Sequence, residues 1–130
     1  MFIETPKTVV AKSAENTFDF LNDLSNFEQL MPENIDKFEV LNENRFLFSL
    51  KGMPEIVLEK KEQFPYSKLV LGAASDKLPF TLTADITGLQ ENKCEVALLF
   101  SGEFNAMMAM MIKSPITNFM NTLSNNLGKI

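Results

Sequence analysis

The last quarter of the chain carries apolar residues at helical spacing, and this stripe most constrains the fold. Six large apolar residues within residues 104–127 follow one another at steps of three or four: Met108, Ile112, Ile116, Phe119, Leu123 and Leu127. Side chains at these steps stack over one another on one side of an α-helix. The pattern therefore predicts one long amphipathic helix, which needs an apolar surface to pack on.

The middle of the chain shows the alternation that is typical of β-strands. Six strands are predicted between residues 37 and 102, and the clearest of them alternates Phe80, Leu82, Ala84 and Ile86 with polar residues. Residues 8–11 predict a seventh strand, which Pro6 places at an edge or a bulge. Short connections, such as the turn predicted at residues 75–77, favour sequential antiparallel pairing. We expect an α+β domain whose curved seven-stranded sheet wraps around the long helix.

A turn at residues 52–54 (GMP) predicts how two of these strands pair. A three-residue turn aligns Phe48 with Leu58, so that the apolar faces of the two strands match. It also places Lys51 opposite Glu55, where the opposite charges attract.

Two short helices are predicted between the first strand and the others. Ser13 offers an N-cap oxygen to the first helix. Ser25 and Glu28 have the spacing of a capping box, which predicts the start of the second helix. Pro32 ends that helix, because the residue before a proline is disfavoured in helical conformation.

Length and composition indicate one ordinary globular domain, residues 1–130. No apolar run approaches the roughly 18 residues that a membrane span needs, and the first residues lack the pattern of a secretory signal. The single cysteine, Cys94, cannot form an internal disulfide. We therefore expect a cytoplasmic protein without stable membrane insertion.

The charge balance and the missing residue types narrow the chemistry. The net charge is −5 and Arg45 is the only arginine, so the phosphate backbone of a nucleic acid would be repelled. The chain has no histidine, which removes the commonest general base, the usual zinc ligand and any Ser-His or Cys-His pair. We expect no nucleic-acid partner, no metal and no cofactor. Carboxylates remain as the plentiful acid or base groups.

The order of predicted elements (strand, two short helices, six strands, long helix) resembles the helix-grip, START-like (SRPBCC) superfamily. Residues 9–23 (VVAKSAENTFDFLND) resemble its opening strand-to-helix motif. Residues 26–32 (NFEQLMP) resemble the second-helix segment of the carbon-monoxide-dehydrogenase-subunit-G and ubiquinone-binding branches. The resemblance covers the full chain and extends to polyketide cyclases. It implies a cavity between the sheet and the last helix that accepts hydrophobic molecules, in a superfamily of binders, carriers, cyclases and adaptors.

On this basis we expect the chain to bind a small hydrophobic molecule, such as a lipid, an isoprenoid or a polyketide-like compound, without covalent chemistry. The candidate wall consists of apolar residues from the inward faces of the strands and the helix: Phe46, Phe48, Leu58, Leu71, Leu82, Leu98, Phe100, Met108, Met111 and Phe119.

Lys60 and Glu62 are the candidate polar contacts of this ligand. The register set by the predicted turn places Lys60 beside Phe46 and Glu62 beside Asn44, on the apolar face. Charges buried there without partners would be costly. Either the strand has left the core at that point, or a bulge rotates both residues outward, or they line the cavity and meet a polar group of the ligand.

The start of the long helix and its proline each have two interpretations. Methionine suits either an adaptable cavity wall or gap-filling in an ordinary core, and five methionines gather in this segment: Met107, Met108, Met110, Met111 and Met120. Pro115 removes the donor for the Met111 carbonyl and predicts a kink or a break near residues 113–114. Such a feature either gates the cavity or follows the curvature of the sheet.

Two alternative functions remain open. An enzyme of the cyclase or hydrolase kind would use Glu62 and water, and would need this carboxylate in an apolar pocket that raises its pKa. An interaction module would have a filled core and a binding strip around Ala97 and Leu99, where a homodimer partner or an early strand could pack.

Overall fold

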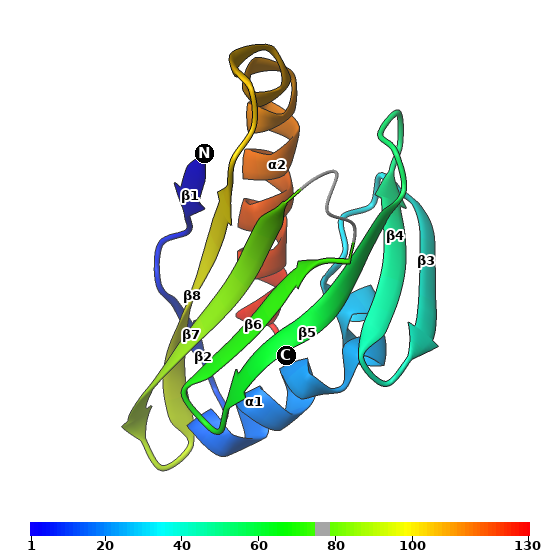
Figure 1. Ribbon diagram of the computed structural model, residues 1–130. Helices are drawn as coiled ribbons and strands as arrows, with labels where there is room; N and C mark the ends of the chain where they lie inside the picture. The colour runs from blue at the N-terminus through cyan, green and yellow to red at the C-terminus, as the bar shows by residue number, and fades with distance from the viewer. Residues whose placement is uncertain (75–78) are drawn as a thin grey trace.

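The computed structural model describes residues 1–74 and 79–130, which form one antiparallel sheet with helices on its concave side and at one end (Figure 1). The eight strands are β1 (Phe2–Glu4), β2 (Thr8–Val10), β3 (Ile35–Asn42), β4 (Arg45–Leu50), β5 (Ile56–Phe64), β6 (Lys68–Ala73), β7 (Phe80–Gln90) and β8 (Lys93–Gly102). The helices are α1 (Ala14–Asn22), the 3-10 helix η1 (Leu24–Leu30) and α2 (Ala106–Leu127). The predicted α+β class is confirmed. The turn predicted at 75–77 lies outside the described residues.

The strand order is β1-β8-β7-β6-β5-β4-β3, so the six strands from β3 to β8 meander in sequence as predicted. The predicted first strand is instead two short strands, β1 and β2, which both pair with β8. Pro6 lies between them. It has no backbone N–H group, and at this position the sheet needs no hydrogen bond from it. Thr5 bridges the gap, because its amide donates to the Leu98 carbonyl (2.9 Å) and its hydroxyl accepts from the Leu98 amide (3.1 Å). The described sheet therefore has eight strands where seven were predicted.

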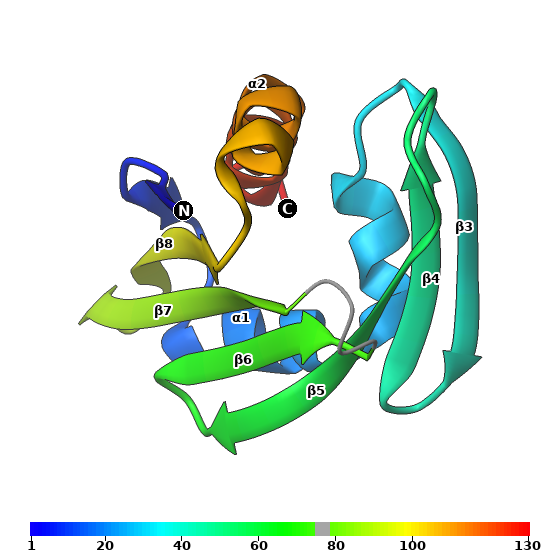
Figure 2. The same cartoon turned by 45° about the horizontal axis from the view of Figure 1, so that its top comes forward.

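Helix α2 lies across the concave face of the sheet (Figure 2). The second half of the predicted stripe is buried: Ile116, Phe119, Leu123 and Leu127. The ring of Phe119 stacks on that of Phe48, with centroids 5.1 Å apart and planes 5° apart. The helix continues through Pro115 without interruption, so of the predicted kink or break the break is wrong, and the kink stays a prediction. The residues that follow the proline on the inward side are buried against the sheet.

The cap of α1 is as predicted, and that of η1 is not. The Asn16 amide donates to the Ser13 hydroxyl (3.1 Å) at the start of α1. At η1 the cap is Asp23, whose Oδ1 accepts from both the amide (3.1 Å) and the hydroxyl (2.7 Å) of Ser25. A carboxylate accepts more strongly than the predicted serine hydroxyl. The two hydrogen bonds from Ser25 lower the pKa of Asp23 below its ordinary value.

The pairing of β4 with β5 differs from the prediction by two residues. Phe48 lies opposite Ile56, because the chain turns earlier than predicted: the Met53 amide donates to the Leu50 carbonyl (2.9 Å), and Gly52 has a positive φ of 84°. Glu55 accordingly pairs with Lys37 (3.4 Å) and not with Lys51. A shift by an even number of residues leaves every side chain on its own face of the sheet. The apolar face therefore still points toward α2.

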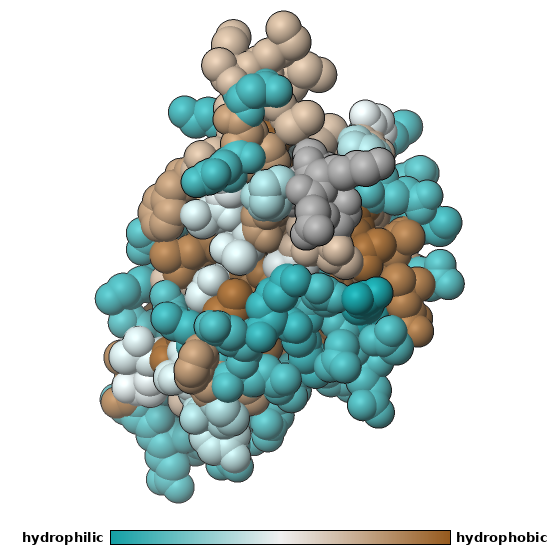
Figure 3. Space-filling model, in the orientation of Figure 1, coloured by the Kyte–Doolittle hydropathy of each residue, from teal (hydrophilic) through white to brown (hydrophobic). Residues whose placement is uncertain are grey.

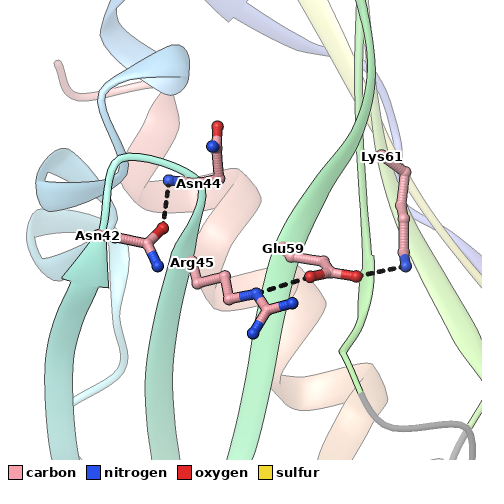
Figure 4. Close-up of polar contacts among 5 residues, drawn as sticks. All are labelled: Asn42, Asn44, Arg45, Glu59 and Lys61. Carbon is pink, nitrogen blue, oxygen red and sulfur yellow. Dashed lines mark hydrogen bonds and ion pairs between the residues drawn. The ribbon is translucent and has the colours of Figure 1, made fainter.

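The outer face of the same strands is charged (Figure 4). The Glu59 carboxylate accepts from Lys61 Nζ (2.6 Å) and from Arg45 Nε (2.7 Å). The hydrogen bond from Lys61 and that from Arg45 lower the pKa of Glu59. The sheet thus has a solvated outer face, and its apolar inner face is available to the helix.

Truncation of a methionine should affect the stability of the protein differently in the two halves of α2. Met120 is fully buried, so Met120→Ala should lower the free energy of unfolding by about 2–5 kcal/mol. Met110 is 83% exposed, and Met110→Ala should change that free energy by less than about 0.5 kcal/mol. Urea unfolding followed by circular dichroism measures both. Equal losses in the two variants would contradict the described packing of the helix.

A candidate ligand-binding cleft under the start of the last helix

A cleft of about 370 Å³ lies between the first half of α2 and the sheet. Its walls come from α2, from the β4–β5 loop, and from β4, β5, β7 and the end of β8. Methionine side chains that line it are themselves exposed, namely Met107 (74%) and Met111 (71%). The cleft is therefore open at the end of the molecule where α2 begins.

Two aromatic stacks form opposite walls of the cleft. On one side Phe119 stacks on Phe48. On the other, Phe100 stacks on Phe80 (5.0 Å) and on Phe104 (6.2 Å), the residue that leads from β8 into α2. All five rings line the cleft.

Gly102 allows the second stack to form. A Cβ atom at this position would lie 2.7 Å from the Phe104 ring and 2.8 Å from Cβ of Phe80. Any larger residue would therefore force Phe104 or Phe80 to shift and would disturb this stack. The chain can turn tightly from strand to helix only because this side chain is missing.

The opposite end of the interior is filled. Among the described residues of the sheet, α1, η1 and the end of α2 lies a void of about 10 Å³, which is about the space of one water probe. Leu71 and Leu98, two predicted wall residues, lie around this void. Phe46, a third, is fully buried between Phe27 (5.2 Å) and Phe38 (5.4 Å). The structure places these three in the closed core and not in the cleft.

The remaining apolar residues of the predicted wall do line the cleft: Phe48, Leu58, Leu82, Phe100, Met108, Met111 and Phe119. Sequence reasoning missed further lining residues. Phe80 alternates with Leu82, and Ile112 and Ile116 belong to the apolar stripe, so the pattern held a signal for these three. The loop residues Met53 and Pro54 gave none, because they belong to the predicted turn, and a turn pattern does not tell which way its side chains point.

Lys60 and Glu62 do not line the cleft, which corrects their predicted role as polar contacts. A bulge lies between them: Lys60 pairs with Leu71, whereas Glu62 pairs with Val70. The extra residue rotates Glu62 to the outer face, where it is exposed. Lys60 borders surface grooves near η1, where its charge adds to the hydrogen bonds of Ser25 in lowering the pKa of Asp23.

The cleft is apolar almost throughout. Among the described lining residues, Asn105 is the one with a polar side chain, and its Oδ1 already accepts from the Met108 amide (2.8 Å) to cap α2. No acid, base or nucleophile stands among the described lining residues. The cleft can accept an apolar group by shape and by removal of water from its walls.

The conditions for both alternative functions are unmet in the described residues. Glu62 is exposed and not in an apolar pocket, so the enzymatic alternative that depends on it is not supported. Ala97 is 8% exposed and Leu99 pairs with Glu4 of β1, so the early strand packs beside the predicted interaction strip. A homodimer stays a prediction.

Within residues 1–74 and 79–130, no helix is long and apolar enough to cross a membrane. The same residues hold no cluster of three or more acidic or cysteine side chains that could hold a metal ion.

No protein-family model matches the sequence, and no curated protein matches it. Solved structures do match. Norcoclaurine synthase from Thalictrum flavum, in complex with dopamine and hydroxybenzaldehyde, is 11% identical with a TM-score of 0.76, over 99% of this chain and 84% of that one. A START superfamily protein from Mycobacterium smegmatis is 13% identical with a TM-score of 0.74, over 98% and 94%.

A third match is the di-domain aromatase/cyclase BexL from the BE-7585A biosynthetic pathway. It is 12% identical with a TM-score of 0.65, and the alignment covers 98% of this chain and 46% of that one. Identities this low show a shared fold. The chain has the helix-grip fold of START-like (SRPBCC) proteins, as the order of its elements predicted.

Proposed function

We propose that the protein binds a small hydrophobic molecule in the cleft between α2 and the sheet, without covalent chemistry. The observation that carries this proposal is the cleft itself: about 370 Å³, open at one end and lined, among the described residues, by apolar side chains except for Asn105. An apolar surface left exposed to water in this way is costly unless something covers it.

The volume of the cleft bounds the ligand. It lies near the lower end of the roughly 300–1,000 Å³ of small-molecule pockets. This size suits a compact ring system or one end of a longer chain whose remainder leaves through the open side. Each methylene group that enters contributes about 0.8 kcal/mol. A lipid, an isoprenoid and a polyketide-like compound all meet these requirements.

The methionines support a wall that adapts to its guest. The cleft is lined by Met53, Met107, Met108, Met111 and Met120. Their unbranched, polarizable side chains can change rotamer at little cost and follow the contour of different apolar molecules. The cavity-wall interpretation of these residues is therefore the one we adopt, with Met120 also closing the core beneath them.

Filling the cleft should block it. Met108 lines the cleft, so Met108→Trp should weaken binding of the uncharged fluorescent probe N-phenyl-1-naphthylamine by roughly tenfold or more, because overpacking typically costs about 1–3 kcal/mol. Met110 does not line the cleft, so Met110→Trp is the matched control and should bind as the wild type does. Fluorescence titration measures both. Equal affinities in the two variants would contradict the placement of the site.

An apolar compound should also accompany the protein from its source. Native mass spectrometry of protein purified from its own host should show a bound species, and Met108→Trp should reduce its occupancy. Absence of any bound compound, together with no displacement of the probe by a panel of lipids and polyketides, would overturn the proposal.

Removing the two charges that lie outside the cleft should leave binding unchanged. Neither Lys60 nor Glu62 lines the cleft, so Lys60→Ala and Glu62→Gln should alter the affinity for the same probe by less than about twofold, a change well under 1 kcal/mol. A loss of roughly tenfold in either variant would show that these residues reach the ligand after all.

A further inference from the structure

The first two turns of α2 are apolar on both sides of the helix. Residues 106–112 (AMMAMMI) contain no polar or charged side chain. At 100° per residue, Met108 and Ile112 lie toward the sheet, whereas Met107, Met110 and Met111 lie on the outward side. These three are 74%, 83% and 71% exposed.

The same outward side becomes polar further along the helix. Positions that continue the line of Met107 and Met111 carry Ser114, Asn118 and Asn125. A helix that is hydrophobic all round normally lies in an apolar environment, and one with a polar outer side lies against water. Only the start of α2 has the composition of a segment that is covered on every side.

The start of α2 projects past the ends of the strands (Figure 1), and hydrophobic atoms gather at that end of the molecule (Figure 3). We call the three exposed methionines of this segment, Met107, Met110 and Met111, the apolar tip. A projecting tip is convex, so a protein partner would need a complementary hollow. Three side chains also fall well short of the ~800 Å² per partner that a stable complex buries. The surface of a fluid bilayer can adapt to a convex tip and needs no preformed hollow.

The position of the tip and the net charge of the protein both favour an apolar contact with a bilayer. Met107 and Met111 also line the cleft, so the tip and the opening of the site are continuous. The net charge is −5, so attraction to anionic lipids would not hold the protein on a membrane. Contact must come from apolar side chains, and it should persist on zwitterionic lipid and at high salt.

We propose that the tip of α2 inserts reversibly into the surface of a lipid bilayer, which places the opening of the cleft against the membrane. In this proposal the contact is peripheral: only the apolar tip enters the bilayer surface. This inference goes beyond the proposed function and can be tested without a ligand.

A tryptophan reporter tests it directly, because the chain has no tryptophan of its own. The emission of Met110→Trp should shift to the blue on addition of phosphatidylcholine vesicles. Leu89, 45% exposed near the turn between β7 and β8 at the other end of the molecule, gives the control Leu89→Trp, which should not shift (Figure 1). No shift at the tip, or equal shifts at both ends, would overturn the proposal.

A charge at the tip should separate membrane contact from ligand binding. Met110→Glu should reduce co-sedimentation with the same vesicles roughly tenfold or more, because a buried apolar side chain is replaced by a charge. Affinity for N-phenyl-1-naphthylamine should not change, since Met110 does not line the cleft. If vesicles bind but no probe does, the proposed function fails and the membrane contact stands.

A second copy of the chain is the competing occupant of the tip. Sedimentation velocity without lipid distinguishes it. A dimer that Met110→Glu dissociates, in a protein that does not bind vesicles, would overturn the proposal, whereas a monomer that binds vesicles supports it.

Discussion

The stacking of Phe119 on Phe48 fixes where α2 crosses the sheet, and the rest of the structure depends on this contact. Both rings are almost fully buried. Phe46 continues the aromatic contacts from Phe48 (6.0 Å) to Phe27 of η1 (5.2 Å). One series of stacked rings therefore connects α2, the sheet and η1 at the level of Phe119. Beyond that level the helix closes the core, where the described residues surround a void of about 10 Å³. Before it, the helix runs out over the cleft.

The cleft is therefore a consequence of a helix held at two places. Phe119 anchors its middle, and Phe104 on Phe100 anchors the chain just before its start. Between these anchors, the helix side chains that line the cleft are methionines and isoleucines, apart from Asn105, and they do not fill the space. A shorter helix would leave the sheet uncovered, and a helix with a polar start would make the site wet. The Met-rich start serves the proposed ligand on one side and the proposed bilayer contact on the other.

The sequence predicted the fold well because the pattern of inward residues is robust to error. The β4–β5 register was wrong by two residues, yet Phe48 and Leu58 still face inward, because side chains alternate with a period of two. The site was predicted less well. The position of Glu62 was predicted wrongly, because a bulge follows Lys60 and the alternation of residues in the sequence does not reveal a bulge. Leu71 and Leu98 were placed in the cavity because periodicity marks a buried face without telling whether the space beside it is filled. Nor did the pattern show that Met53 lines the cleft, since this depends on the conformation of one loop.

The central claim, that an apolar molecule occupies the cleft, can be tested by NMR of the methionine methyl groups. The chain has eight, and labelling their methyl groups with ¹³C gives reporters inside the cleft, on its rim and in the remote core. Titration with N-phenyl-1-naphthylamine should shift the methyl resonances of Met53, Met108, Met111 and Met120, which line the cleft, and leave that of Met31, buried beside η1, unchanged. Shifts at Met31 without shifts at Met108 and Met120, or no shifts at saturating probe, would contradict the account.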